Sequence, residues 1–197
     1  MNSKTFIFAG PQGCGKGTQV ALLRNYLKKI DPERPQFQVI SGDKLRAFKE
    51  GESFSAHLTK DRIGRGELAP LFLVIYLWAE EYIKNITGNE HIFIDGSPRV
   101  IEESYAIDSA MKFYKREKPY LIYITLPREE SKTRLMKRAR HDDTEESLNK
   151  RLEWSEKFTV PAIEYLKNTG DYEYIEINGL QSIEEVEKEI HSKLGLE

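Results

Sequence analysis

The chain has 197 residues, of which 39% are hydrophobic and 31% are charged, which suits one domain with a buried core. The formal net charge of −2 at pH 7 gives no reason to expect nucleic-acid binding. A single cysteine excludes an internal disulfide and any zinc site built from several cysteines. The longest apolar run, residues 71–79, is too short to span a membrane, and the N-terminus carries no secretory signal. We therefore expect a soluble, cytoplasmic protein that acts as a monomer and binds neither nucleic acid nor membrane.

Apolar, β-prone segments alternate along the chain with segments whose apolar residues have helical spacing. The expected strands are residues 6–9, 37–40, 91–94, 120–126 and 172–177. The expected helices are residues 16–30, three pieces within 45–84 with breaks near 51–53 and 64–66, and then 101–115, 129–140, 145–168 and 182–194. This alternation predicts an α/β fold, a five-stranded parallel sheet flanked by helices on both faces. Ligands of such sheets bind beyond the carboxyl ends of the strands, so functional residues should follow each strand.

The first strand runs into a glycine-dense turn, residues 10–18, and a helix follows at once. This context is typical of a phosphate-binding loop, in which backbone N–H groups, a helix N-terminus and Lys16 surround the phosphates of a nucleoside triphosphate. The general pattern has Ser or Thr directly after the lysine, where the hydroxyl helps to hold Mg²⁺. Here that position is Gly17, and Thr18 comes one residue later. Cys14, inside the loop, is either a reactive thiol or a small side chain that fits a tight turn.

Polar motifs follow the second and third strands. Residues 41–46 read Ser-Gly-Asp-Lys-Leu-Arg, which is also a helix-start signal, although that interpretation leaves Arg46 unexplained. Residues 95–99 read Asp-Gly-Ser-Pro-Arg. An aspartate such as Asp95, at the end of a buried strand and near a phosphate-binding loop, is the expected partner for Mg²⁺. The alternative is a turn that only ends the strand.

An arginine-rich segment, residues 132–143, follows the fourth strand. Arg134 and Arg138 are four residues apart and share a helix face, and Arg140 and Arg151 add further positive charge. Taken alone, the segment could be a solvated helix whose arginines pair with neighbouring acids. Phosphoryl transfer between two polyphosphates, however, requires several converging cations. The phosphate-binding loop in the same chain favours this second interpretation.

The loop Gly-Pro-Gln-Gly-Cys-Gly-Lys-Gly-Thr-Gln, residues 10–19, closely resembles that of adenylate kinases and related nucleoside monophosphate kinases. The motifs at 41–46 and 95–99, the basic helix and the pair Asp142 and Asp143 follow in the family's order, so the resemblance covers nearly the whole chain. It implies a P-loop kinase that moves the γ-phosphate of ATP·Mg²⁺ to a nucleoside monophosphate and forms two nucleoside diphosphates. The family also has glycine at the position of Gly17, which implies that Mg²⁺ is held largely through water.

The resemblance also implies an organisation of residues 1–197 as a single nucleoside monophosphate kinase domain. The core would comprise residues 1–40, 86–137 and 144–197, with an NMP-binding subdomain at 41–85 and a short lid at 138–143. So short a lid has no room for a zinc-binding insertion, so no structural zinc is expected.

The resemblance implies the following site residues. The catalytic group is Lys16, Arg99, Arg138, Arg140 and Arg151. The ATP site is Gly13, Cys14, Gly15, Lys16, Gly17, Thr18, Arg134, which would stack on the adenine, and Gly179. The monophosphate site is Ser41, Arg46, Glu67, Leu68, Gly96, Arg99 and Glu103. Asp43 and Asp95 would hold Mg²⁺ through water, and the Ser97–Pro98 bond would be cis.

Two departures from the family pattern concern the acceptor. Ser97 stands where the family has phenylalanine, and Glu103 stands where adenylate kinases have a glutamine that reads the acceptor adenine. An ionised carboxylate only accepts hydrogen bonds, which suits ring N–H donors such as those of guanine, uracil or thymine. AMP is the first expectation, and a UMP/CMP- or GMP-type kinase is the alternative, with Pro70 resembling pyrimidine-specific members. The other rivals are a P-loop kinase of a small metabolite alcohol and a non-catalytic nucleotide-binding factor.

Overall fold

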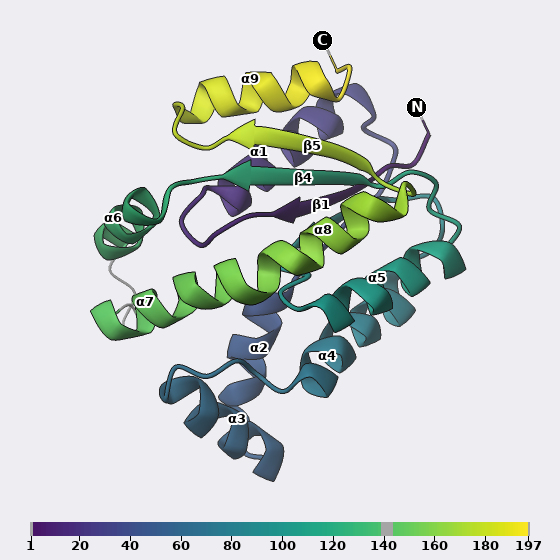
Figure 1. Cartoon of the computed structure of the whole chain (residues 1–197). Coiled ribbons are helices and arrows are strands. Elements are labelled where there is room, and N and C mark those ends of the chain that lie inside the picture. Colours follow the sequence, from purple (N-terminus) through teal and green to yellow (C-terminus); the bar gives the residue numbers. More distant parts are fainter. Residues whose placement is uncertain (1, 139–143, 197) are drawn as a thin grey trace.

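A computed structural model describes residues 2–138 and 144–196. Its centre is a five-stranded parallel sheet with the strand order β2-β3-β1-β4-β5 (Figure 1). The strands are β1 Thr5–Ala9, β2 Gln36–Ile40, β3 His91–Asp95, β4 Tyr120–Thr125 and β5 Glu173–Asn178. Helices cover the sheet, so the predicted α/β fold with a five-stranded parallel sheet is confirmed.

The helices were also largely predicted from the spacing of apolar residues. They are α1 Lys16–Ile30, α2 Ser41–Lys49, α3 Phe54–Gly64, α4 Leu71–Asn85, α5 Ile101–Phe113, α6 Arg128–Arg138, α7 Glu145–Trp154, α8 Val160–Thr169 and α9 Ile183–Lys193. None of these described helices is both long and apolar enough to cross a membrane.

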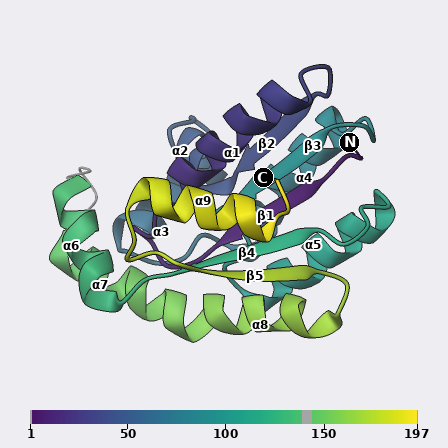
Figure 2. The same ribbon diagram turned by 90° about the horizontal axis from the view of Figure 1, so that it is seen from above.

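Side chains of β1 alternate between two hydrophobic cores, one on each face of the sheet. Phe6 and Phe8 pack with residues of α1 and α9, whereas Ile7 packs with residues of α4, α5 and α8. Figure 2 shows α1 and α9 on one side of the sheet and α8 on the other. Because both faces are covered, β1 and β3 are buried along their whole length, which explains their continuous apolar sequences.

The register of the sheet brings three strand ends together. Asp95, the last residue of β3, pairs with Phe8 of β1 on one side and with Ile40, the last residue of β2, on the other. The segments that follow β1, β2 and β3 therefore leave the sheet at one edge. Helices α6 and α7 lie at the same end, toward which the strand arrows point in Figure 1, and α2 and α3 project below it.

Two helices differ from their predicted extents by more than two residues or are interrupted. Helix α2 begins at Ser41 rather than at residue 45, because Ser41 to Lys44 already form its first turn. The predicted helix 145–168 is interrupted by a π-helix, Ser155–Thr159, between α7 and α8. Pro161 explains the interruption, since proline has no backbone N–H and its ring crowds the carbonyl four residues earlier, which favours a wider turn. The end of the predicted helix 129–140 lies outside the described residues.

Candidate active site

The loop between β1 and α1 is shaped by glycines. Gly10 has a φ of 137°, and a Cβ atom there would lie 2.3 Å from the carbonyl oxygen of Ile124, so no other residue fits. Gly15, with a φ of 95°, caps the N-terminus of α1 in the left-handed conformation. The loop is thus folded tightly against β4, with the start of α1 at its mouth. This is the arrangement that binds phosphate at a helix N-terminus.

Lys16 closes this loop. Its Nζ donates to the carbonyl oxygens of Gly10, at 2.8 Å, and Pro11, at 2.9 Å, and lies 3.5 Å from the Sγ atom of Cys14. The ammonium group is therefore held over the loop on which a phosphate would lie. Cys14, whose thiol this ammonium group contacts, is a buried residue that is 3% exposed.

Asp95 lies beside the phosphate-binding loop. A Cβ atom at Gly17 would be 3.6 Å from its Oδ2 atom, so the carboxylate stands next to the position where other phosphate-binding loops carry a hydroxyl. Burial raises the pKa of Asp95, whereas the charges of Lys16 and Arg99 lower it and Asp43 raises it. A carboxylate between two cations and near a second carboxylate suits Mg²⁺, which prefers oxygen ligands.

A cavity of about 560 Å³, here called the main cavity, brings most of the predicted residues together. It extends from the phosphate-binding loop to α2 on one side and to α6 and α7 on the other. The predicted residues in its lining are Gly13, Gly15, Lys16, Gly17, Thr18, Asp43, Arg46, Glu67, Leu68, Asp95, Gly96, Arg99, Arg134, Arg138 and Arg151. Six of these carry positive charge. Cations from five separate segments of the chain therefore converge on one space.

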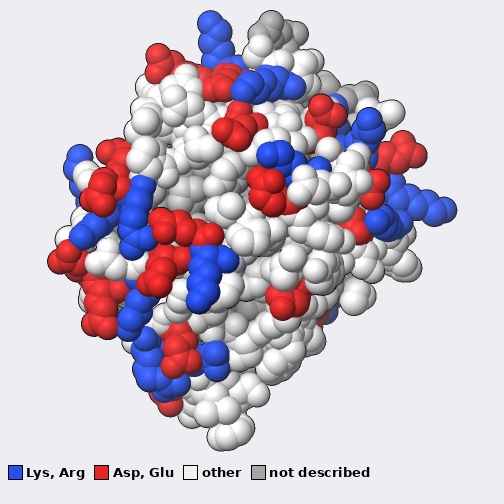
Figure 3. Space-filling model, in the orientation of Figure 1, with Lys and Arg blue, Asp and Glu red and all other residues white. Residues whose placement is uncertain are grey.

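The face of the molecule seen in Figure 3 does not share this concentration of cations. Its Lys and Arg side chains are interleaved with Asp and Glu, with no large patch of one sign. Several cations of the cavity are themselves in ion pairs: Arg134 with Glu130 at 2.7 Å, and Arg46 with Asp43. The side chains in these pairs are partly exposed, so each pair contributes little free energy. The arginines could therefore leave their acidic partners and bind the phosphates of a substrate.

Arg99 has a defined orientation within the main cavity. Its Nε donates to the carbonyl oxygen of Gly96 at 3.0 Å, and its own carbonyl accepts a hydrogen bond from Thr159 at 3.1 Å. Burial lowers the pKa of its guanidinium, while Glu103 and Asp95 raise it. The turn before it contains the cis Ser97–Pro98 bond, as predicted. The terminal nitrogens of Arg99 thus face the cavity from a rigid turn.

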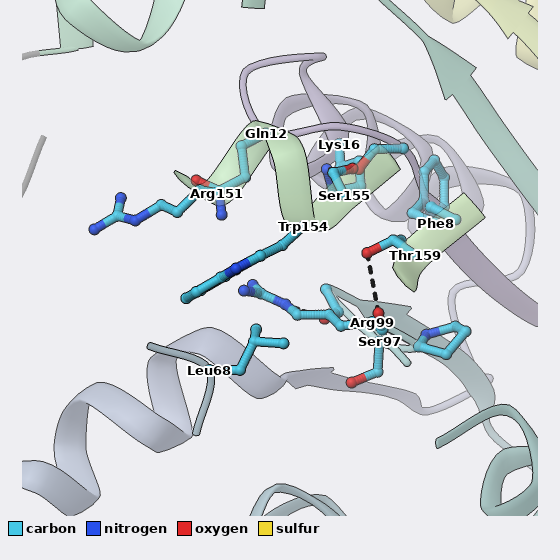
Figure 4. A pocket seen from close by; sticks show the side chains of 14 residues that line it. Phe8, Gln12, Lys16, Leu68, Ser97, Arg99, Arg151, Trp154, Ser155 and Thr159 are labelled. Carbon is cyan, nitrogen blue, oxygen red and sulfur yellow. Dashed lines mark hydrogen bonds between the residues drawn. The ribbon is translucent and has the colours of Figure 1, made fainter. Parts of the chain in front are cut away.

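A narrower pocket adjoins the main cavity between the loop and the α7–α8 helix (Figure 4). Its lining includes Lys16, Arg99 and Arg151, but also Trp154, which sequence reasoning missed. The indole projects toward the pocket together with the two arginines (Figure 4). The spacing of Arg151 and Trp154, three residues apart on one helix face, was the available signal.

A second hollow beside the main cavity, here called the slot, holds the remaining acceptor-side residues. Its lining is Ser41, Gly42, Leu45, Leu68, Ala69, Leu71, Val74, Gly96, Arg99, Val100 and Glu103. Glu103 is 3% exposed, and its carboxylate accepts a long hydrogen bond of 3.4 Å from the backbone N–H of Arg99. Burial raises the pKa of Glu103, while the Ser97 hydroxyl and the Arg99 charge lower it. The hydroxyls of Ser41 and Ser97 lie 2.8 Å apart beside it.

A few predicted residues lie elsewhere. Gly179 follows β5 and donates its N–H to the carbonyl oxygen of Thr125 at 2.9 Å, away from the linings described above. Arg140 and the pair Asp142 and Asp143 lie outside the described residues. Within residues 2–138 and 144–196, no three His, Cys, Asp or Glu side chains gather as metal ligands.

The sequence matches the family model described as "Adenylate kinase" over residues 8–171. It is 33% identical over 187 residues to an adenylate kinase of Leptospira biflexa, covering 93% of this chain and 95% of that protein. It is 28% identical over 192 residues to an adenylate kinase of Prochlorococcus marinus, covering 98% of this chain and 99% of that protein. It is 35% identical over 180 residues to adenylate kinase 1 of Schistosoma mansoni, covering 88% of this chain and 84% of that protein.

Proposed function

The chain belongs to the adenylate kinase family and is a nucleoside monophosphate kinase, and we propose that it transfers the γ-phosphate of ATP to AMP with the residues of the main cavity. One observation supports these roles above all others. The six predicted cationic side chains, from five separate segments, line the same cavity as a phosphate-binding loop. A phosphoryl group that passes between two phosphorylated substrates needs this positive surround.

The donor site is proposed at the start of α1. The β- and γ-phosphates of ATP lie on the loop before this helix, where N–H groups and the helix dipole favour negative charge. Lys16 then exchanges its contacts with the carbonyls of Gly10 and Pro11 for phosphate oxygens and follows the moving group. Arg134 then breaks its ion pair with Glu130 and stacks its guanidinium on the adenine.

The acceptor site is proposed on the other side of the cavity. Arg46 and Arg99 hold the phosphate of AMP, since both line the cavity opposite the loop. The adenine enters the slot, whose lining is apolar apart from Ser41, Arg99 and Glu103. This places one acceptor oxygen in line with the γ-phosphate. Residues 41–85 then act as the NMP-binding subdomain, and residues 138–143, of which 139–143 lie outside the described part, as the lid.

Mg²⁺ is proposed to bind near Asp95 and Asp43, whose carboxylates lie in the same cavity. When bound, it neutralises charge on the donor phosphates. Because Gly17 has no hydroxyl, Asp95 would be the main residue to hold the ion, through water.

The chemistry requires no nucleophile or general base from the protein. The AMP phosphate attacks directly, and Arg138 and Arg151 neutralise the charge that develops on the transferred group. Trp154 adds an apolar surface beside Arg151, which helps to keep water from the γ-phosphate. A cytoplasmic, monomeric state stays a prediction.

The test is diphosphate formation from ATP·Mg²⁺ with AMP, CMP, UMP, dTMP and GMP in turn. We expect AMP to be phosphorylated with a higher kcat/KM than any of the pyrimidine monophosphates. Lys16→Ala is the control for catalysis by the described cavity. Steady ATP hydrolysis that needs no acceptor, with no diphosphate formed from any monophosphate, would contradict the proposal.

A further inference from the structure

Glu103 is one of three polar side chains that line the slot, with Ser41 and Arg99. The side chains of Leu45, Leu68, Leu71 and Val74 belong to the apolar part of the lining. A flat aromatic base fits such a lining, and only the polar groups can distinguish one base from another by hydrogen bonding. The protonation state of this buried carboxyl therefore decides which hydrogen-bonding edge the slot accepts.

No neighbouring group in the described part of the chain fixes Glu103 in its charged form through an ion pair. In the described part of the chain no cationic side chain forms an ion pair with it, and the guanidinium of Arg99 donates instead to Gly96. Burial raises the pKa of Glu103, and so does the exposed Glu102 on the same helix, whereas the Ser97 hydroxyl and the charge of Arg99, both from the turn before this helix, lower it.

The elements packed around the slot add little further charge to it. Helix α4 contributes only apolar side chains to the lining. Helix α2 contributes the hydroxyl of Ser41, while its charged residues Asp43 and Arg46 line the main cavity and pair with each other. From the segment between α3 and α4, Glu67 likewise lines the main cavity and pairs with Arg65. Next to Glu103, a neutral hydrogen bond joins α5 to α8: the Ser104 hydroxyl donates to the carbonyl oxygen of Ala162. No fixed ion pair thus holds Glu103 in one state.

The two states match different purines. A protonated carboxyl has one O–H donor and one acceptor oxygen, which complement the ring nitrogen N1 and the 6-amino group of adenine. A carboxylate offers two acceptors side by side, which complement the N1–H and 2-amino donors of guanine. Uracil and thymine present a single ring N–H flanked by two carbonyl oxygens, so the second carboxylate oxygen would face an acceptor. The carboxylate therefore favours guanine among the bases that carry a ring N–H.

We propose that Glu103 gives the enzyme a second acceptor, a guanine nucleoside monophosphate, and that the proton on this carboxyl selects between the two purines. The acid form takes AMP, and the carboxylate form takes GMP. The inference rests on the proposed function, since it assumes that the slot holds the acceptor base.

This mechanism makes a quantitative prediction that does not depend on the pKa of Glu103. In the free enzyme, the ratio of acid to carboxylate falls about tenfold for each unit of pH. If each form uses one purine, the ratio of kcat/KM for AMP to kcat/KM for GMP falls by the same factor. Titration of the acceptor phosphate and of every other group in the cavity affects both substrates alike and cancels in the ratio.

The experiment measures both kcat/KM values between about pH 5.5 and about pH 8 at constant ionic strength. The wild-type ratio should fall by about tenfold per pH unit until a residual cross-activity limits it. Glu103→Gln cannot ionise, so its ratio should be independent of pH and should favour AMP. Glu102→Gln, at an exposed position on the same helix, should keep the tenfold slope of the wild type, with the profile shifted slightly toward GMP because the charge that opposes ionisation of Glu103 is removed. Ser97→Ala removes a hydroxyl that favours the carboxylate and should shift the whole profile toward AMP.

The outcomes test the role of Glu103 and the kinase activity separately. A wild-type ratio that does not change with pH, measured on an enzyme that phosphorylates AMP, overturns the role of Glu103 and leaves the kinase assignment intact. Preferential use of UMP or CMP at high pH overturns the choice of guanine. Failure to phosphorylate any monophosphate overturns the proposed function itself. The wild-type measurement alone decides the matter even if a variant does not fold.

Discussion

Replacing Arg99 by lysine should reduce kcat/KM for AMP by about 10- to 140-fold. The side chain already uses Nε for the carbonyl oxygen of Gly96, so its two terminal nitrogens remain for the acceptor phosphate. Lysine keeps the charge but offers a compact ammonium in place of this fork. One charged hydrogen bond is then lost, worth about 1.5–3 kcal/mol, and 1.4 kcal/mol corresponds to about tenfold.

The assay is the initial rate of ADP formation, with AMP varied at saturating ATP·Mg²⁺ and then the reverse. The KM for AMP should rise more than the KM for ATP, since Arg99 is proposed to hold the acceptor phosphate. Arg128→Lys is the matched control, because Arg128 pairs with Glu156 at the start of α6 and lines none of the three hollows. The reasoning is refuted if the Arg99 variant stays within about threefold of the wild type, or if only the KM for ATP rises.

Three further predictions concern the loop, the fold and the pH dependence of stability. Lys16→Ala should lower kcat by about 100-fold or more while the melting temperature stays close to that of the wild type, and unchanged turnover would contradict the proposed mechanism. Gly179→Ala should lower the free energy of unfolding by about 1–3 kcal/mol, because its Cβ would lie 2.4 Å from the carbonyl oxygen of Thr125. Gly64→Ala, where no atom lies within 4 Å of the added Cβ, should cost almost nothing in the same urea titration. Burial lowers the pKa of His91 below its ordinary value of 6.5. As the pH decreases below about 6.5, the unfolded chain therefore binds a proton at this side chain before the folded chain does, and the free energy of unfolding should fall. In His91→Gln this fall, measured by urea unfolding at pH 7 and pH 5.5, should be smaller.

The parts of the fold that follow from local pattern could be predicted. The apolar runs of β1 and β3 mark them as strands buried on both faces, and the spacing after Thr18 defines α1 to the residue. The motifs after β1, β2 and β3 meet because parallel strands end at one edge. The start of α2 at Ser41 was missed because the apolar spacing begins only at Leu45, although the Ser-Gly-Asp signal was visible.

The features that depend on distant contacts could not be predicted. Ser41 and Ser97 are 56 residues apart, and no local pattern indicates that their hydroxyls meet beside Glu103. The orientation of Trp154 into the pocket likewise depends on how α7 packs against α6, through Leu135, Leu148 and Leu152. The resemblance assigned the arginines to a common site, but their ion pairs with Glu130 and Asp43 depend on side-chain geometry.

The π-helix between α7 and α8 limits how the chain can change in length. A π turn holds one more residue than an α turn, so removing one residue from Ser155–Thr159 and restoring α geometry would leave α7 and α8 nearly in register. Trp154 would still line the pocket, and Ile163 and Leu166 would still pack in the core. An added residue has no such accommodation, because an α-helix turns by about 100° per residue and α8 would rotate by that angle relative to α7. The segment should therefore tolerate the loss of one residue better than the gain of one.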